Sequence, residues 1–378
     1  MKVAIIHYWF VGMRGGEKVV EALCRMYPQA DIFTHVVDRT RLSRELLAHN
    51  IRTTFIGRLP GATRHYKKFL PLMPLALEQL DLRGYDLVIS SESGPAKGVL
   101  TRADTPHVCY CHSPMRYLWD FYQDYLEEAG WFMRGMMRPW FHYLRMWDAV
   151  SAMRVDRCVA NSRTVAARIR KHWRRDAVVV TPPVEVDAFA AAAPAPPAND
   201  APYLCLGQLV GYKRVDLAVR ACTATNRPLV VAGEGEMRRA LEAVAGPSVR
   251  FAGRLDDEAM RAIYASSRAL LFPGEEDFGM VPVEAMASGR PVIAYGRGGA
   301  LETVVDGETG LFFGEQSVDA LVAALDRFEH AEHQFDPARI AAHARNFGEE
   351  RFRAEFGAVV EEALREVAGP GMVQARQG

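Results

Sequence analysis

The sequence predicts an α/β protein built from two doubly wound parallel sheets. Its 378 residues exceed the size at which one hydrophobic core stops growing, so two domains are expected. Short apolar runs, typical of parallel strands buried on both faces, alternate with helical stretches in both halves of the chain. An Ala- and Pro-rich stretch at residues 188–202 has no buried pattern and separates the halves.

These runs define the expected domains. We expect residues 1–187 to form the first domain, 188–202 a linker and 203–345 the second domain, with a C-terminal helix and tail at 346–378. The expected strands are Val3–Ile6, Leu87–Ile89, His107–Cys111, Cys158–Ala160, Ala177–Val180, Tyr203–Leu206, Leu229–Ala232, Val249–Ala252, Leu270–Phe272 and Val292–Ala294.

Composition excludes some classes of protein. Lys and Arg together number 46, as do Asp and Glu, so nucleic acid is not an expected partner. The six cysteines have no Cys-x-x-Cys spacing, which favours reduced thiols in the cytosol. The N-terminal apolar run breaks at His7, too early for a signal peptide, and no run is long enough to span a bilayer. We therefore expect a cytoplasmic protein.

Two carboxylates, Glu276 and Glu284, flank the junction between a buried strand and a helix. Pro273-Gly274 ends the strand, and Met280 to Ser288 is expected to be helical, with Pro282 tolerated in its first turn. Glu276 then lies in the loop and Glu284 in the helix. Backbone N–H groups near Gly279 and Met280 would face an anion. This pattern favours a ligand that carries both phosphate and hydroxyl groups.

Glycine-rich turns follow other expected strands of the second half. Leu206–Arg214 places Lys213 and Arg214 just past a strand, an arrangement suited to a diphosphate, although a solvated basic turn is the alternative. Gly233-Glu234-Gly235 begins like a dinucleotide fingerprint but has Arg238 at the third glycine position, so the fingerprint fails. Gly296–Gly299 follows another strand and would allow close backbone approach to a ligand.

The second half resembles the donor half of the family 4 retaining glycosyltransferases of the GT-B fold, over most of residues 200–315. The resemblance rests on the order of its motifs along the chain: the Lys213-Arg214 turn, Gly253-Arg254, the acid pair, Gly298-Gly299 and Glu302. In the first half, Gly15–Lys18 is similar to the family's glycine loop, and Asn161-Ser162 matches another recurring position. The segment Tyr110–Asp120 is most similar to bacterial mannosyltransferases of O-antigen and exopolysaccharide assembly. The resemblance implies two Rossmann-like domains facing a central cleft, with the C-terminal helix returning to the N-terminal domain.

The resemblance also implies roles for individual residues. Glu276 would contact the donor hexose, Glu284 the ribose, and His112 the transferred sugar. Gln208 stands where many family members carry a phosphate-binding arginine, so Lys213 is expected to carry more of the diphosphate charge, and a contact from Gln208 or Arg214 stays open. The implied catalytic residues are Glu276, His112 and Lys213, and the implied donor-binding residues are Gly15, Gly16, Lys213, Arg214, Arg254, Phe278, Gly279, Met280 and Glu284.

The implied reaction is transfer of a hexose, most readily mannose from GDP-mannose, to a polyprenyl-diphosphate-linked glycan in cell-surface polysaccharide synthesis. A UDP-hexose or GDP-fucose is the alternative donor. An NAD-dependent oxidoreductase or a non-catalytic nucleotide binder is the alternative from a different class. No metal or other cofactor is expected, because the chain has no Asp-x-Asp and Cys109, Cys111 and His112 have no second cluster of ligands. No oligomeric state is predicted.

Two stretches of the first half combine basic and apolar residues. Residues 58–77 and 131–147 carry Arg and Lys among aromatic, Leu and Met side chains. Such a combination suits the surface of an anionic membrane, although aromatic and Met residues at helical spacing also form cores. We expect peripheral contact with the inner face of the plasma membrane, with burial in the core as the alternative.

Overall fold

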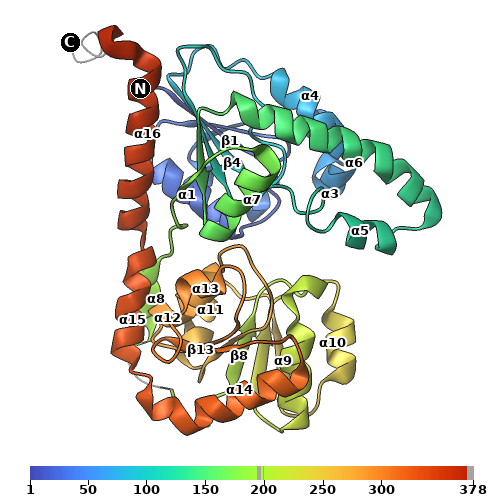
Figure 1. The fold of residues 1–378 in the computed structure, drawn as a ribbon, viewed down its shortest axis with the longest axis vertical. Coiled ribbons are helices and arrows are strands. Elements are labelled where there is room, and N and C mark those ends of the chain that lie inside the picture. The colour runs from blue at the N-terminus through green and yellow to red at the C-terminus, as the bar shows by residue number, and fades with distance from the viewer. Residues whose placement is uncertain (194–196, 199, 373–378) are drawn as a thin grey trace. The chain divides into compact units, whose positions relative to one another are not determined.

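The computed structural model describes residues 1–193, 197, 198 and 200–372, and the chain divides into two compact units (Figure 1). The N-terminal unit contains Met1–Thr181 together with the chain from Phe352 onward. The second unit contains Pro182–Arg351. Each unit holds one sheet whose named strands pair in parallel, with helices packed on its faces, so the predicted fold class is confirmed.

The sheet of the N-terminal unit has the strand order β3-β2-β1-β4-β5-β6-β7. The expected strands are confirmed, whereas β2 and β3 were not predicted. They were missed because Asp31, Asn50 and Arg52 interrupt their apolar character. The strands are β1 (Val3–His7), β2 (Asp31–Thr34), β3 (Asn50–Thr53), β4 (Leu87–Glu92), β5 (His107–Cys111), β6 (Arg157–Ala160) and β7 (Val178–Val179).

Helices cover both faces of this sheet. The apolar side of α1 packs against β1 and β4 together with Phe352 and Phe356 of α16. Leu144 and Trp147 of α6 contribute to a separate cluster with Ala4 and Ile6 of β1. The helices are α1 (Gly15–Met26), α2 (Arg44–Leu47), α3 (Ala62–His65), α4 (Met73–Glu78), α5 (Tyr122–Glu128), α6 (Trp131–Ser151), α7 (Arg163–Trp173) and α16 (Glu349–Met372), with a 3₁₀ segment η3 (Tyr66–Leu72) between α3 and α4.

A buried ion triad lies beside this second cluster. The ammonium of Lys97 is 3.1 Å from a carboxylate oxygen of Glu92 and 2.5 Å from one of Asp148, and all three side chains are fully buried. The indole N–H groups of Trp119 and Trp173 donate to the other oxygen of Asp148, each at 2.8 Å. Although burial opposes its charge, Asp148 and Glu92 raise the pKa of Lys97. The triad ties β4 to α6 and was not predicted.

Two buried histidines should make this protein sensitive to acid. Burial lowers the pKa of His35 to about 4 and that of His107 to about 3, from a usual 6.5. The folded state therefore keeps both rings neutral, while the unfolded chain takes up protons below pH 6.5. Stability is complete above that pH and is lost as the pH falls towards 4, by about 2 kcal/mol for each histidine at pH 5.

Urea unfolding between pH 8 and pH 5 measures this slope. His35→Gln should flatten it, because the ring that takes up a proton on unfolding is gone. His333→Gln, a change at an exposed position, should leave the slope as in the wild type. A wild-type stability that is unchanged from pH 7.5 to pH 5 would contradict the prediction.

The sheet of the second unit has the order β10-β9-β8-β11-β12-β13. The five strands expected from apolar runs are confirmed, and β13 was missed because two glycines flank its short apolar run at the edge of the sheet. The strands are β8 (Tyr203–Leu206), β9 (Leu229–Ala232), β10 (Val249–Gly253), β11 (Leu270–Phe272), β12 (Val292–Tyr295) and β13 (Gly310–Phe313). The helices are α8 (Val186–Ala192), α9 (Val215–Ala224), α10 (Arg238–Val244), α11 (Asp257–Ala265), α12 (Met280–Ala287), α13 (Ala300–Thr303), α14 (Val318–Ala331) and α15 (Pro337–Ala344).

The chain passes between the units earlier than expected. The boundary lies at 181/182 rather than at 187, and residues 188–192 of the expected linker belong to α8. The ring of Phe189 packs edge-on against Tyr264 of α11, with ring centroids 5.5 Å apart, which places α8 in the second unit. Alanine favours helices, so an Ala-rich stretch beside Val186 and Phe189 forms one. Residues 194–196 and 199 of the expected linker lie outside the described residues.

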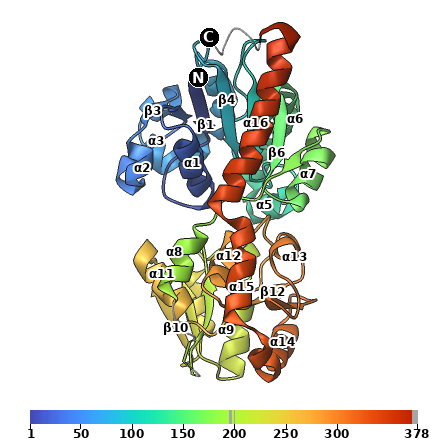
Figure 2. The same ribbon diagram turned by 90° about the vertical axis from the view of Figure 1, so that its left-hand side faces the viewer.

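The C-terminal helix returns to the N-terminal unit, as the family resemblance implied. From Phe352 onward α16 packs in the first unit, and Figure 2 shows it crossing the face of the first sheet beside α1. Its start at Glu349 confirms the predicted helix, whereas the second unit extends to Arg351 instead of ending at 345. The expected tail at 373–378 lies outside the described residues.

Candidate active site

Both sheets have a point where the strand order reverses. In the first sheet it lies between β1 and β4, and in the second between β8 and β11. The loops that leave neighbouring strands on the two sides of such a point diverge, so a crevice opens at the carboxyl ends of the strands, where open α/β sheets bind ligands. Sequence-predicted site residues follow the strands at both points.

Lys213 and Glu276 meet at the reversal point of the second sheet. Lys213 ends the 3₁₀ segment η5 (Gly211–Lys213) after β8, and Glu276 lies in the loop after β11. The Nζ of Lys213 is 2.9 Å from Oε1 of Glu276, and their side chains are 15% and 20% exposed. Burial opposes the charge of Lys213, but the Glu276 carboxylate outweighs it and raises the pKa of Lys213. A cation and a carboxylate acceptor are therefore held together, mostly buried, with a small part of each side chain exposed.

Glycines allow the loops around this pair to approach closely. A Cβ on Gly274 would lie 2.7 Å from the backbone of Lys213, and one on Gly298 would lie 2.5 Å from the carbonyl oxygen of Glu276. Gly298 also has a φ of 62°, a left-handed conformation that L side chains rarely adopt. The amide of Gly299 donates to the Glu276 carbonyl at 2.8 Å, so the loop after β12 holds the Glu276 backbone in place.

Glu284 lies in α12, as predicted, and has a specific partner. The buried hydroxyl of Tyr264 donates to Oε2 of Glu284 at 2.7 Å. Burial raises the pKa of Tyr264, so this phenol stays a donor. Gly279, with a φ of 85°, caps the helix before Met280, and Phe278 packs in the core beneath the loop. The helix therefore starts at the reversal point, and Tyr264 orients Glu284 within it.

Three other predicted residues do not join the Lys213 and Glu276 pair. The guanidinium of Arg214 pairs with Asp216 in the first turn of α9, with Nε 3.2 Å from Oδ1. Arg254 is exposed on the loop after β10, and Gln208 is exposed after β8. In the described part of the second unit, Lys213 is thus the cation that pairs with Glu276.

The N-terminal unit carries a second polar cluster, at the reversal point of its own sheet. Nε2 of His112, just after β5, is 2.8 Å from the Ser91 hydroxyl of β4. Nδ1 of His7, the last residue of β1, is 3.0 Å from the same hydroxyl. A Cβ on Gly16, at the start of α1, would lie 2.6 Å from the Tyr8 hydroxyl and 3.6 Å from Nε2 of His112. Gly16 and His112 therefore lie side by side, as the predicted site requires, and their role in binding stays a prediction.

Burial, with a smaller contribution from His7, lowers the pKa of His112 to about 3. The ring is therefore neutral at physiological pH and can donate or accept one hydrogen bond at each nitrogen. His7 and Ser91 were not predicted. The available signal was their position, because each is a polar residue at the carboxyl end of a buried strand.

The described residues contain no cluster of potential metal ligands. Among them, no group of three or more His, Cys, Asp and Glu side chains is arranged to hold a metal ion. All six cysteines are buried free thiols, and burial raises the pKa of Cys109 and Cys111.

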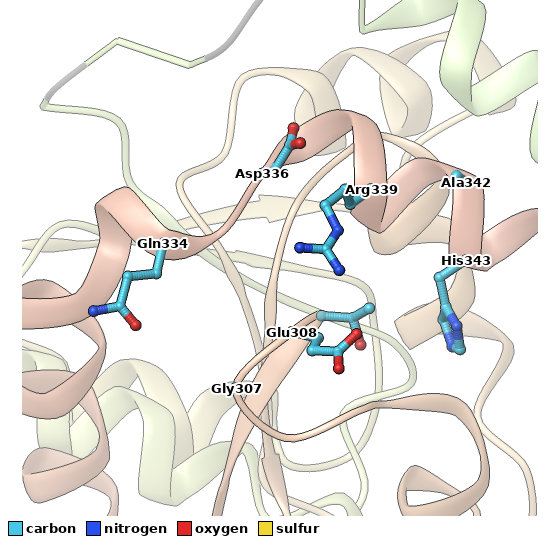
Figure 3. Close-up of a pocket in the computed structure, with 8 residues that line it drawn as sticks. Gly307, Glu308, Gln334, Asp336, Arg339, Ala342 and His343 are labelled. Carbon is cyan, nitrogen blue, oxygen red and sulfur yellow. The ribbon is translucent and has the colours of Figure 1, made fainter.

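A separate pocket of about 290 Å³ lies beside the start of β13, the edge strand of the second sheet (Figure 3). Arg339 of α15 points towards Glu308, in the turn that precedes β13. Because that turn enters its strand, the pocket lies at the amino ends of the strands and is distinct from the reversal point. It is lined by Gly307, Glu308, Thr309, Gln334, Asp336, Arg339, Ala342 and His343.

Two family models together match residues 13–347 of the chain, and they overlap at residues 166–188. Residues 13–188 match the model described as Glycosyltransferase Family 4, and residues 166–347 match the model described as Glycosyl transferases group 1. The chain belongs to the family 4 type of GT-B glycosyltransferases. The first model includes β4 but begins after β1, whereas the second model includes both β8 and β11, together with Lys213, Glu276 and Glu284.

Curated relatives and solved structures agree with this family. The chain is 37% identical over 121 residues to the GDP-mannose-dependent alpha-mannosyltransferase of Mycolicibacterium smegmatis, covering 32% of this chain and 31% of the relative. It is 26% identical over 373 residues to the alpha-1,3/1,6-mannosyltransferase alg2 of Schizosaccharomyces pombe, covering 82% and 70%. The chain spans about a third to a half of the length of several other curated relatives.

The fold is shared with solved structures. Anabaena HepE in complex with UDP and glucose matches with a TM-score of 0.70 at 16% identity, covering 96% of this chain and 99% of that one. Sucrose-phosphate synthase from Thermosynechococcus elongatus has the same TM-score at 20% identity, covering 96% and 98%. These matches confirm the GT-B fold, and the predicted closeness to O-antigen enzymes stays a prediction.

Proposed function

We propose that this protein transfers a hexose, with retention of configuration, from a nucleoside diphosphate sugar, and that the donor is GDP-mannose. The observation that carries the proposal is the Lys213 and Glu276 pair at the reversal point of the second sheet. Transfer needs a positive charge for the departing diphosphate and an acceptor for sugar hydroxyls. The pair supplies both, and mannosyltransferases among the relatives support mannose as the sugar.

The proposed chemistry begins with charge on the leaving group. The bond between C1 and the diphosphate oxygen breaks as the acceptor hydroxyl bonds to C1. Negative charge develops on the departing oxygen, and the diphosphate takes up the acceptor's proton. Lys213 and the backbone N–H groups at the start of α12, near Gly279 and Met280, stabilise this charge. Glu276 accepts hydrogen bonds from the hexose hydroxyls, and Glu284 accepts them from the ribose. In the N-terminal unit, neutral His112 is our candidate for a contact with a hydroxyl of the transferred sugar.

One observation argues against the alternative function, that of an NAD-dependent oxidoreductase. Arg238, at the third glycine position of a dinucleotide fingerprint, pairs with Glu234 at 2.6 Å and with Glu242 at 2.9 Å. A large, paired side chain there prevents the close helix and strand packing that the third glycine permits. Nucleotide-sugar binding needs no such glycine.

We propose a polyprenyl-diphosphate-linked glycan as the acceptor, at an anionic membrane surface. Residues 58–77 and 131–147 contain Lys and Arg among apolar side chains and contain no Asp or Glu. In the described part of the chain no helix is long and apolar enough to cross a membrane, so the proposal is for contact from one side.

Thermal-shift screening against nucleotide sugars tests the function. GDP and GDP-mannose should raise the unfolding midpoint with or without a chelator, and Lys213→Ala should weaken the shift. Stabilisation by UDP-hexoses but not by GDP-mannose would change the proposed donor. Stabilisation by NAD alone would overturn the function, and radiolabelled transfer from the stabilising donor would complete the test.

Glu284→Ala should weaken nucleoside diphosphate binding by roughly ten- to a hundredfold, because the ribose loses a charged acceptor worth about 1.5–3 kcal/mol. The same change leaves the buried Tyr264 hydroxyl without its carboxylate partner and should lower stability. Tyr264→Phe is the matched control, since it removes that hydrogen bond but keeps the carboxylate. Calorimetry should find much tighter GDP binding by Tyr264→Phe than by Glu284→Ala. Normal GDP binding by Glu284→Ala would end its ribose role.

Ser91→Ala should lower kcat/KM about two- to tenfold, because it removes the hydrogen bond that orients His112. Ser90→Ala is the control one residue earlier on the same strand, where the hydroxyl bonds His107 at 2.8 Å and faces the core. Both changes should lower the unfolding midpoint, but only Ser91→Ala should slow transfer. Equal rates for the two variants would exclude a positioning role for Ser91.

A further inference from the structure

A line of polar side chains connects helix α1 to the site histidine. Oε1 of Glu17, in the first turn of α1, lies 4.0 Å from Nε2 of His7. Nδ1 of His7 is 3.0 Å from the Ser91 hydroxyl, and that hydroxyl is 2.8 Å from Nε2 of His112. The line therefore runs from α1 through β1 and β4 to the residue that follows β5.

The start of this line is buried and holds an unpaired nitrogen. His7 is 1% exposed and Glu17 is 2% exposed. Nε2 of His7 has no hydrogen-bond partner in the described part of the chain. The second oxygen of Glu17, Oε2, accepts a hydrogen bond from the backbone N–H of Arg14 at 3.1 Å, so Oε1 is the oxygen that faces His7. A buried polar atom without a hydrogen bond is rare, and its position beside a carboxylate indicates a role.

The Glu17 carboxylate determines where His7 carries its proton. A carboxylate attracts an N–H and repels a nitrogen lone pair, and water does not screen this preference in a buried site. Nε2 of His7 therefore carries the proton, which leaves Nδ1 as an acceptor. The rings of Tyr8 and Phe10 pack on His7, with centroids 4.0 and 4.6 Å away, so little solvent reaches the ring to stabilise a second proton.

The Ser91 hydroxyl transmits this arrangement to His112. A hydroxyl has one proton, so between two rings it donates to one and accepts from the other. Because Nδ1 of His7 is an acceptor, Ser91 donates to it and accepts from the Nε2–H of His112. Burial lowers the pKa of His112 to about 3, so this ring has a single proton and its Nδ1 has none. The ring is half-buried with Nε2 facing the buried Ser91, which leaves Nδ1 as the nitrogen open to a ligand.

We propose that Glu17 and His7 are positioning residues that set the tautomer of His112, so that Nδ1 of His112 accepts a hydrogen bond from a substrate hydroxyl. This rests on the proposed function, in which the hydroxyl belongs to the transferred sugar. An acceptor at this position selects a hydroxyl over a carbonyl or phosphate oxygen. Gly16 allows α1 to begin directly against the line, since a Cβ there would lie 3.5 Å from the His7 ring and 3.6 Å from Nε2 of His112.

NMR of the full chain with nitrogen-labelled histidine reads the tautomer directly, because protonated and unprotonated ring nitrogens resonate far apart. The signals of His112 and His7 are identified by their loss in His112→Gln and His7→Phe. In the wild type without ligand, we expect the proton of His112 on Nε2. A proton on Nδ1 of His112, or protons on both nitrogens of His7, would overturn the proposal.

Glu17→Gln should reverse the line while keeping the side-chain shape and the helix cap. Only the amide oxygen can accept from the Arg14 N–H, so the NH₂ group turns to His7 and favours an unprotonated Nε2. The proton of His112 should then move to Nδ1, and kcat should fall about two- to tenfold through the loss of one hydrogen bond. Calorimetry should find an unchanged affinity for GDP. The control is Glu21→Gln, one turn later in α1 and also 2% exposed, which should keep the tautomer and the rate.

A double variant tests whether Glu17 acts through His7. His7→Phe removes the connection, so adding Glu17→Gln to it should lower kcat no further. Additive losses would overturn the proposal, as would a wild-type tautomer in Glu17→Gln. Absence of transfer from every nucleotide sugar would count against the proposed function alone, since the tautomer is read in the protein without donor.

Discussion

Glu276→Ala should lower kcat by about a hundredfold or more, while the affinity for the nucleoside diphosphate changes only modestly. Glu276 is proposed to contact the transferred hexose, and hydrogen bonds to that sugar count most as its bond to the diphosphate breaks. The nucleotide itself makes no contact with this carboxylate in the proposal. Radiolabelled transfer gives kcat, and calorimetry with GDP gives the affinity.

Glu276→Gln separates two effects of the carboxylate. The amide can still hydrogen-bond the sugar hydroxyls, but it no longer forms the ion pair that places Lys213 at 2.9 Å. Its kcat should therefore lie between those of the wild type and the Ala variant. A wild-type kcat for Glu276→Ala would remove this residue from the site, whatever the result for Glu284.

Lys97→Met should destabilise the N-terminal unit by about 3–5 kcal/mol. The change leaves the carboxylates of Glu92 and Asp148 fully buried without their cation, and such uncompensated charges cost far more than a lost surface ion pair. The hydrogen bonds that remain, from Trp119 and Trp173 to Asp148 and from two backbone amides to Glu92, do not supply a positive charge. Urea or thermal unfolding measures the loss.

Arg102→Met is the matched control for this change. Arg102 pairs with Asp104 at 3.0 Å, but the two side chains are 59% and 49% exposed, so water screens the pair. Its loss should cost between about 0 and 1 kcal/mol. A Lys97→Met variant as stable as Arg102→Met would show that the buried triad contributes little to this fold.

The parts of the fold that could be predicted are those with a local signal. Strands such as Leu270–Phe272 are continuous apolar runs, and β13 was missed because it is short, lies at the edge of the sheet and is flanked by glycines. The linker was partly misplaced because Ala favours a helix once Val186 and Phe189 have a core to pack against. Local composition does not report that core.

The candidate site also contains residues that the sequence could predict and residues that it could not. Glu276, Glu284 and Lys213 could be found because they follow strands in a recognisable order. Arg214 and Lys213 are adjacent, yet only Lys213 pairs with Glu276, since Arg214 adopts a left-handed backbone conformation, with a φ of 50°, and turns to Asp216. Tyr264, His7 and Ser91 come from other elements, and no sequence spacing links them to the residues they orient.

By itself the sequence determined the fold class, most strands, the loop position of Glu276 and the helical position of Glu284, because apolar periodicity and glycine placement are local properties. Only the tertiary structure decided which groups meet. It paired Lys213 with Glu276 and His112 with Ser91, and it left eight large hydrophobic side chains of α6 exposed. The physical reason is that periodicity specifies which residues share a face, whereas burial depends on what the rest of the chain packs against that face.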